Sequence, residues 1–339
     1  DTPSPSGRAI LSLPELPRPD AIDQVRARIA AHIVETPVID WPAADVAAAT
    51  GVALDLSVKL ELFQRAGSFK ARGALNNILT LSADQRARGV TAVSAGNHAI
   101  ATAFAARAAD SHAKVVMAAN ASPFRIAQCR AVGADVVLAD DIAAAFAEVR
   151  RIADAEGRAF IHPFRGITTH MGPATLAREW LGQAPDLDAL VVPVGGGGLI
   201  CGIALAVKSL KPSCRIFGVE PTGAASMGAA YHAGRPVDTA PHATIADSLA
   251  PPPPADADNL AICQAYVDDF VTVSDADTRV AMRVMLAHLK LAVEPAPATG
   301  LAAMIGPLAA RLAGRKTGLL ICGANIDAAH FQGLISTDE

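Results

Sequence analysis

The chain has 339 residues, of which 51% are hydrophobic, and its formal net charge is −4 at pH 7. This length allows a sizeable buried core and two lobes, while the scattered Lys and Arg residues form no basic stripe, which argues against a nucleic-acid partner and favours a small molecule. No apolar run approaches the roughly 18 residues that a membrane helix requires, so we expect no membrane partner.

The hydrophobic pattern along the chain predicts an α/β fold. Short runs rich in Val and Ile alternate with Ala-rich stretches, which is typical of parallel sheets wrapped by helices. The expected strands are 90–94, 114–118, 135–138, 189–194, 215–219 and 318–322, and the expected helices include 99–109 and 200–209. The proline run at 251–254 indicates a surface loop and not a domain linker, because strand and helix patterns continue on both sides.

The stretch 63–79, FQRAGSFKARGALNNIL, places a lysine at the start of a predicted helix. Ser68 is typical of an N-cap, which puts Lys70 in the first helical turn. There the positive end of the helix dipole disfavours a second positive charge and favours a neutral, nucleophilic amine. A solvated surface lysine is the alternative that composition alone favours.

The stretch VSAGNHAIATAF joins a predicted strand to a predicted helix through residues 94–98. Backbone N–H groups at this helix start, with the Ser94 hydroxyl, suit a carboxylate, and Asn97 adds a neutral donor and acceptor. His98 offers either a general base or a loop anchor, and it has no metal-ligand spacing around it.

Four glycines, Gly195 to Gly198, follow a predicted buried strand and precede a helix in VVPVGGGGLICGIAL. Their N–H groups can enclose an anion, so the loop predicts a phosphate site. No GxGxxG register fits, although Glu220 ends the next strand near the place of a ribose-binding acid, so a dinucleotide-dependent oxidoreductase stays as an alternative.

Cysteines are few and widely spaced. The five have no CxxC pair, which predicts reduced thiols in a cytoplasmic protein. Cys322, at the end of a predicted strand in GLLICGANID, is on its own typical of a buried core cysteine.

In order and spacing, the motifs GSFKARGALN, SAGNH, VGGGGL, GVEP and CGANID resemble those of the fold type II pyridoxal-phosphate enzymes, and within them the threonine dehydratase and serine racemase group. The resemblance covers nearly the whole chain from about residue 20. It implies a two-lobed, tryptophan synthase β-like fold, with a small domain at 82–165 and a large pyridoxal-phosphate-binding domain at 1–81 and 166–339.

The resemblance also assigns roles to residues around the cofactor. Lys70 forms a Schiff base with pyridoxal 5'-phosphate and acts as the catalytic base, and Phe69 lies beside it. The phosphate is held by Gly195, Gly196, Gly197, Gly198 and Leu199. Asn97 contacts the phenolic oxygen, and Cys322 faces the ring nitrogen where relatives usually have Ser. The substrate carboxylate is received by Ser94, Ala95, Gly96 and His98.

The implied activity is a dehydratase, or ammonia-lyase, that converts a β-hydroxy amino acid such as L-threonine or L-serine to a 2-oxo acid and ammonia. A racemase is less favoured, because Ala95 stands where racemases carry a serine. A 3-hydroxyaspartate or phenylserine dehydratase and a non-catalytic metabolite sensor remain alternatives. The family also implies a homodimer.

Two further residues bear on ligands. Arg165 could bind a second substrate carboxylate if it faces the cleft, and would be an ordinary solvated arginine if it points outward. Family members with a divalent metal use the Glu of GVEP, here Glu220, with the carbonyl of Ala224 and an acid at the position of Ser226. Because a serine is a poor substitute for that carboxylate, we expect no metal.

Overall fold

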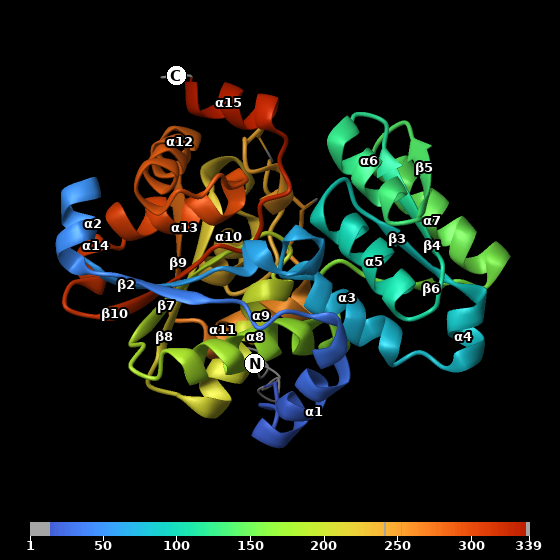
Figure 1. Cartoon of the computed structure of the whole chain (residues 1–339), viewed down its shortest axis with the longest axis horizontal. Helices are drawn as coiled ribbons and strands as arrows, with labels where there is room; N and C mark the ends of the chain where they lie inside the picture. Colours follow the sequence, from blue (N-terminus) through green and yellow to red (C-terminus); the bar gives the residue numbers. More distant parts are fainter. Residues whose placement is uncertain (1–13, 241, 252, 337–339) are drawn as a thin grey trace, which may run out of the picture.

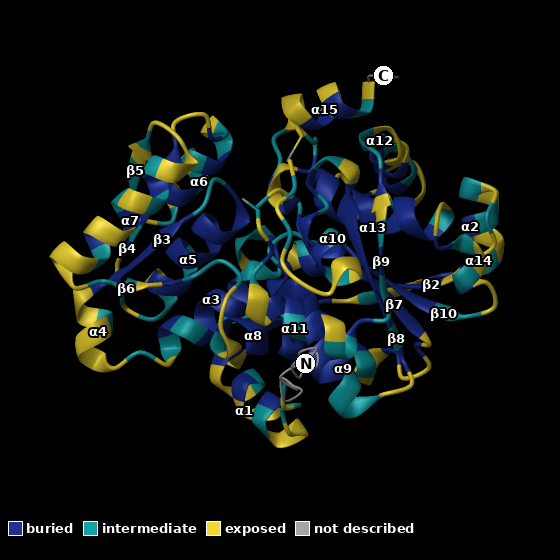
Figure 2. Cartoon of the chain, turned by 180° about the vertical axis from the view of Figure 1, so that it is seen from behind, coloured by how far each residue is buried: buried dark blue, intermediate teal, exposed yellow. Residues whose placement is uncertain are grey.

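The structure is a computed structural model that describes residues 14–240, 242–251 and 253–336. It has two lobes, each built around one sheet, and helix α3 (Lys70–Leu79) lies between them (Figure 1). Figure 2 shows that the central strands of both sheets are buried, whereas exposed residues lie on the outer helices, the loops and the edge strands. The α/β fold predicted from the hydrophobic pattern is therefore confirmed.

The large lobe contains a six-stranded sheet with the strand order β1-β2-β10-β7-β8-β9. Its strands are β1 (Val38–Trp41), β2 (Asp55–Lys59), β7 (Ala189–Pro193), β8 (Arg215–Pro221), β9 (Asp269–Val273) and β10 (Lys316–Leu320). Neighbouring strands are parallel except β1 and β2, which pair antiparallel with Val38 opposite Lys59. Helices cover both faces of this sheet, as a mostly parallel sheet requires.

The small lobe contains a four-stranded parallel sheet with the order β5-β4-β3-β6. Its strands are β3 (Val90–Val93), β4 (Ala113–Ala118), β5 (Asp135–Ala139) and β6 (Ala159–Phe160).

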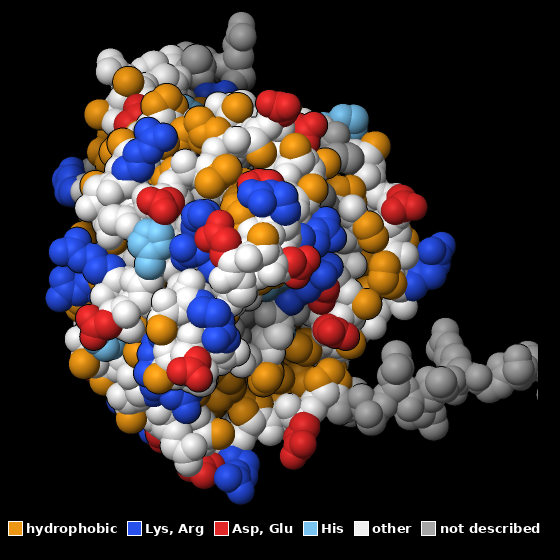
Figure 3. Space-filling model, turned by 90° about the vertical axis from the view of Figure 1, so that its right-hand side faces the viewer, with side chains coloured by type: hydrophobic (Ala, Val, Ile, Leu, Met, Phe, Trp, Pro, Cys, Tyr) orange, Lys and Arg blue, Asp and Glu red, His pale blue; other side chains and the backbone are white. Residues whose placement is uncertain are grey.

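We propose 82–165 as the extent of a small domain and 1–81 with 166–339 as the large domain. On the face of the molecule that carries this lobe, acidic and basic side chains are interspersed (Figure 3).

Helices complete the layers around the two sheets. Besides α3 they are α1 (Pro19–Ile29), α2 (Ala43–Thr50), α4 (Ala83–Arg88), α5 (Asn97–Ala108), α6 (Pro123–Ala131), α7 (Ile142–Glu156), α8 (Ile167–Gln183), α9 (Gly198–Leu210), α10 (Ser226–Ala233), α11 (Ala257–Tyr266), α12 (Asp275–Val284), α13 (Pro295–Ile305), α14 (Ala309–Leu312) and α15 (Ala328–Ser336). Within the described ranges, no helix combines the length and hydropathy of a membrane span.

Alternating strand residues build separate hydrophobic cores on the two faces of each sheet, because successive side chains of a strand point in opposite directions. In β7, Leu190 and Val192 pack with α8, α9 and α11, whereas Val191 packs with α12 and α13. In the small lobe, α5 and α6 cover one face and α7 covers the other. The strand positions are thus determined by burial on both faces.

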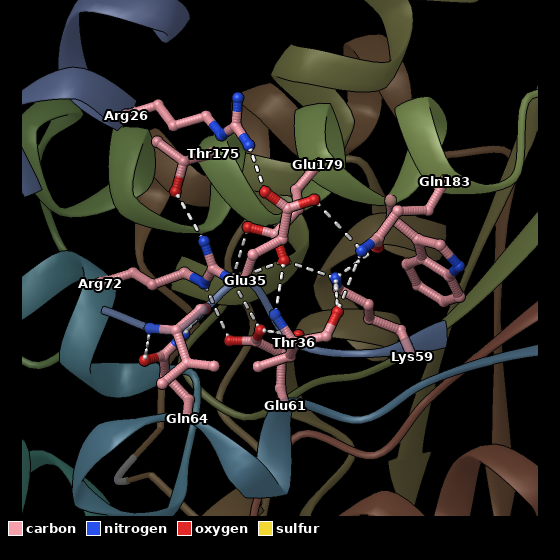
Figure 4. Close-up of polar contacts among 12 residues, drawn as sticks. Arg26, Glu35, Thr36, Lys59, Glu61, Gln64, Arg72, Thr175, Glu179 and Gln183 are labelled. Carbon is pink, nitrogen blue, oxygen red and sulfur yellow. Dashed lines mark hydrogen bonds and ion pairs between the residues drawn. The ribbon is translucent and has the colours of Figure 1, made fainter. Parts of the chain in front are cut away.

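A cluster of buried charged side chains ties α3 to the large lobe (Figure 4). Arg72 donates to both carboxylate oxygens of Glu61, at 2.9 and 2.7 Å, and to Glu179 at 3.1 Å. Lys59 donates to Glu179 at 2.5 Å, and the four side chains are at most 1% exposed. Two cations and two anions balance, so the cluster holds α3 without leaving an unpaired buried charge.

All six strands and both helices predicted from the sequence are present, with boundaries shifted by at most two residues. Strands β1, β2, β6 and β9 were not predicted. The prediction of Ser68 as the helix N-cap is wrong: α3 begins at Lys70, Phe69 occupies the cap position, and no side chain caps the helix. Ser68 instead has an extended backbone that forms an isolated bridge with Gly323.

Candidate active site

A cavity of about 530 Å³ lies where loops of both lobes meet. It is lined by the loops that follow β3, β7 and β10 and by the start of α3. These are the carboxyl ends of parallel strands, where α/β proteins bind ligands. Lys70, the 94–98 loop, the four glycines and Cys322 all line this one cavity.

Lys70 is the first residue of α3 and is half-buried. Its Nζ donates to the carbonyl of Pro163 at 2.6 Å. Burial lowers the pKa of Lys70 to about 8, from an ordinary value of 10.5, while Cys322 nearby acts in the opposite direction. Desolvation is therefore the largest cause of the lowered pKa, and not the helix dipole that the position of Lys70 in the sequence suggests.

The backbone before Lys70 is held by the strand end that carries Cys322. The Phe69 N–H donates to the Cys322 carbonyl at 3.0 Å, next to the bridge between Ser68 and Gly323. The Ser68 hydroxyl is buried and has no hydrogen-bond partner in the part of the chain that the structure describes. The position of Lys70 therefore depends on a backbone contact between segments distant in the sequence.

The lowered pKa of Lys70 predicts a pH-dependent gain of stability in Lys70→Met. Below pH 8 the folded ligand-free protein carries a desolvated Lys70 ammonium, which disfavours folding. Between pH 8 and 10.5 the unfolded state binds this proton and the folded state does not, so the stability of the wild type rises with pH. We expect the variant to melt roughly 2–4 °C higher than wild type at pH 7. Thermal denaturation of the ligand-free proteins should show the difference shrinking above pH 8. If the melting temperatures of the variant and the wild type differed equally at pH 7 and pH 10.5, the cause would be packing and not the charge of Lys70.

The glycine loop combines close packing with free amide donors. A Cβ at Gly196 would overlap the Phe164 ring, and one at Gly198 would lie 2.9 Å from the Phe164 Cα. Gly197 has a φ of 89°, which other residues rarely adopt. Among the described residues, none accepts a hydrogen bond from the N–H groups of residues 196–199. These donors surround the N-terminus of α9, so this loop, here called the phosphate cradle, is suited to hold an anion.

The loop after β3 presents Asn97 at the start of α5. Its Nδ2 donates to Glu294 at 2.6 Å, and its Oδ1 accepts from Asn325 at 2.7 Å. The Ser94 hydroxyl accepts from the Gly96 N–H at 3.1 Å. Asn97 is thus held in one orientation by partners from the large lobe.

His98 lies deeper, at the start of α5. It is 4% exposed, and its Nε2 is 2.9 Å from the carbonyl of Ile161. Burial lowers the pKa of His98 to about 3, and Lys70 contributes to the lowering. The ring is therefore neutral at physiological pH and joins α5 to the segment after β6.

Two charged residues of the site were not identified from the sequence, Arg125 and Glu294. Glu294 is 1% exposed, and its burial raises its pKa to about 7. Arg125, on α6, donates to Asp247 at 2.6 Å, to the Asn325 carbonyl at 3.1 Å and to Glu294 at 3.5 Å. Glu294 stands between Val293 and Pro295 in an otherwise apolar stretch. These apolar neighbours are the sequence signal that could have indicated a buried acid.

Arg165 does not line the cavity. Its side chain is 59% exposed, and its Nε forms an ion pair with Asp256 at 2.5 Å. The structure thus places Arg165 apart from the other predicted site residues.

The Glu220 carboxylate accepts from the N–H groups of Met227 and Gly228, at 2.9 and 2.6 Å, and so caps α10. Burial raises the pKa of Glu220 to about 7. Within the described ranges, no group of three or more His, Cys, Asp or Glu side chains could hold a metal ion.

Comparisons with known proteins agree on one family. The profile of the family described as pyridoxal-phosphate dependent enzyme matches residues 29–323. The chain is 50% identical to a phenylserine dehydratase of Ralstonia pickettii, over 93% of this chain and 95% of the relative. It is 36% identical to an L-threonine ammonia-lyase of Thermotoga maritima, over 83% of this chain and 70% of that protein. The structure of maize serine racemase superposes with a TM-score of 0.87 at 34% identity, covering 95% of this chain and 98% of the racemase.

Proposed function

Because the chain belongs to the family of pyridoxal-phosphate dependent enzymes, we propose that it is a lyase that converts a β-hydroxy-α-amino acid to a 2-oxo acid and ammonia. The observation that carries the proposal is the Lys70 amine, which lies in the same cavity as an anion cradle and a second set of amide donors. An amine with a pKa of about 8 is available as a base and as a nucleophile near neutral pH.

The residues of the cavity fit pyridoxal phosphate. The free N–H groups of Gly196 to Leu199 would hold its phosphate, and the Lys70 amine would meet its aldehyde. Asn97 would lie beside its phenolic oxygen. Burial raises the pKa of the Cys322 thiol, so this side chain stays neutral and would offer the ring nitrogen only a weak donor.

When bound, the cofactor supplies an electron sink for the negative charge that develops at the substrate Cα. Lys70 takes the Cα proton as general base, after which the bond between Cβ and the hydroxyl breaks. The Ser94 hydroxyl and the N–H groups at the start of α5 orient the substrate carboxylate. Loss of one water is followed by addition of one water, so each amino acid yields one 2-oxo acid and one ammonia.

The cavity does not favour an anionic substrate side chain. Arg165 is paired with Asp256 outside the cavity, and the guanidinium that lines it, Arg125, is paired with Asp247 and Glu294. These contacts support a neutral β-hydroxy amino acid over 3-hydroxyaspartate. Racemisation lacks support as well, since Ala95 lines the cavity with a side chain that cannot donate a proton.

We further propose that the protein is a cytoplasmic homodimer that acts on a small amino acid and has no nucleic-acid or membrane partner. The dimer rests on the family resemblance. The cytoplasmic location is supported by the cysteines, all five of which are buried free thiols.

Product analysis of the purified holoenzyme tests the proposed function. The substrates are L-threonine, L-serine, phenylserine and 3-hydroxyaspartate, and the readouts are 2-oxo acid and ammonia. We expect equal amounts of the two products and the lowest kcat/KM for 3-hydroxyaspartate. Absence of 2-oxo acid from all four substrates would overturn the proposal, and formation of a D-amino acid as the main product would identify a racemase.

A further inference from the structure

The active-site cavity has an apolar wall outside the segments that carry the cofactor contacts. Ile142 and Phe146 of α7 contribute to it from the small lobe, and Leu249, Pro251 and Pro253 contribute from the large lobe. None of these five side chains can donate or accept a hydrogen bond. An apolar wall beside a few polar groups is the usual composition of a site that binds an apolar substrate group.

On α7, Ile142 and Phe146 line the cavity, while other apolar side chains of the helix build the core, against which Phe146 also packs. Ile142 and Phe146 are four residues apart and so share one side of the helix. Ala145, Val149 and Ile152 are fully buried in the small-lobe core. Ile142 is 43% exposed and Phe146 is half-buried. These two side chains therefore retain apolar surface that a ligand in the cavity could cover.

The opposite part of the wall is held close to the phosphate cradle. A Cβ at Gly195 would lie 3.1 Å from the Leu249 Cα, so the backbone of this loop packs directly on the glycine loop. Pro251 and Pro253 follow in this loop, and the ring of a proline restricts its backbone φ. Two prolines of this loop, Pro251 and Pro253, line the cavity.

An ion pair links the small lobe to the large-lobe part of the wall. Arg125 of α6 donates to Asp247 at 2.6 Å, and Asp247 begins the short 3-10 helix that ends at Leu249. This contact links the small lobe to the loop of the large lobe beside the cavity. Because the charges that line the cavity here are paired with each other, the wall can accept an uncharged group without leaving a charge unpaired.

We propose that Ile142, Phe146, Leu249, Pro251 and Pro253 form a subsite for an aryl group on the substrate Cβ, here called the aryl subsite. This inference rests on the proposed function and specifies its substrate as a β-aryl-β-hydroxy-α-amino acid, of which phenylserine is the simplest. A phenyl ring can contact both parts of the wall and meet the Phe146 ring edge to face. The methyl group of threonine is too small to cover them, which leaves the apolar wall in water.

The test compares Phe146→Ala and Ile142→Ser with wild type as holoenzymes. The first readout is the ratio of kcat/KM for phenylserine to kcat/KM for threonine. We expect this ratio to exceed 1 in wild type and to fall about 10- to 100-fold in Phe146→Ala, since truncation removes most of the ring contact. Ile142→Ser, at a more exposed position, should lower it in the same direction. Phe63→Ala is the matched control, because Phe63 is 54% exposed and lies outside the cavity.

A second readout does not depend on turnover. L-Phenylalanine and L-alanine have no leaving group on Cβ, so calorimetric titration of the holoenzyme measures their binding alone. We expect phenylalanine to bind more tightly than alanine to wild type, and Phe146→Ala to lose this preference.

An unchanged preference, or an unchanged phenylserine-to-threonine ratio, would overturn the aryl subsite. Dehydration of threonine but not of phenylserine by wild type would also overturn it and leave the proposed function standing. Absence of any 2-oxo acid would refute the proposed function, with phenylalanine binding still measurable.

Discussion

Replacement of Lys70 by Ala is expected to abolish release of ammonia from every β-hydroxy amino acid while the protein remains folded. The variant removes the one amine that lines the cavity in the described part of the chain. We propose this amine as both the covalent partner of the cofactor and the base for the Cα proton. We expect kcat to fall by at least about 10²- to 10⁴-fold, the usual contribution of a general base. Ala is well tolerated in a helix, so α3 should persist and the melting temperature should not decrease.

Lys211→Ala is the matched control for this variant. Lys211 also donates from Nζ to a proline carbonyl, that of Pro185 at 2.6 Å, but it lies on the surface outside the cavity. Activity should be unchanged in the control. Borohydride treatment followed by peptide mass analysis should find the cofactor fixed to Lys70 in wild type and in Lys211→Ala, and on no lysine in Lys70→Ala. Near-normal ammonia release by Lys70→Ala would remove Lys70 from the chemistry.

The sequence predicts strand β7, which is apolar on both faces, and misses strand β2, which carries buried polar residues. Strand β7, ALVVP, is an uninterrupted apolar run, whereas β2, DLSVK, contains Ser57 and Lys59. Both of these polar residues are 0% exposed, because Ser57 accepts from Trp180 and Lys59 pairs with Glu179. A local pattern cannot distinguish such satisfied polar residues from a loop, since their partners lie more than 100 residues away.

In the site, too, local sequence patterns indicate some residues, whereas others depend on partners that are distant in the sequence. Lys70, the four glycines and Cys322 follow local signals of strand ends and helix starts, so a scan along the chain locates them. Asn97 and Glu294 form a hydrogen bond although they are 197 positions apart in the sequence. Arg125 and Asp247 do the same at a separation of 122 positions. Nothing in the sequence near either member indicates its partner. Contacts of this kind become visible only when the two lobes are in place.

Arg72 lies two residues after Lys70 and belongs to the cluster of buried charged side chains in Figure 4. It hydrogen-bonds Glu61, Glu179 and, at 3.3 Å, the Thr175 hydroxyl. Burial alone would raise the pKa of Glu61, but the charge and hydrogen bonds of Arg72 lower it below its ordinary value. Removal of this one cation leaves two buried carboxylates with only Lys59 to balance them.

We therefore expect Arg72→Met to lower the free energy of unfolding by about 3–5 kcal/mol at pH 7, the usual effect of breaking a buried ion pair on one side. Arg26→Met is the control, since Arg26 pairs with Glu35 at the surface with 41% of its side chain exposed, and such pairs contribute about 0–1 kcal/mol. Urea denaturation measures both variants. In Arg72→Met the pKa of Glu61 should rise above its value in the unfolded state. The folded variant then takes up a proton as the pH falls, so its loss of unfolding free energy relative to wild type should shrink between pH 7 and 5. A deficit below about 1 kcal/mol, or one independent of pH, would mean that the packing around α3 and not the buried charge balance holds the helix that carries Lys70.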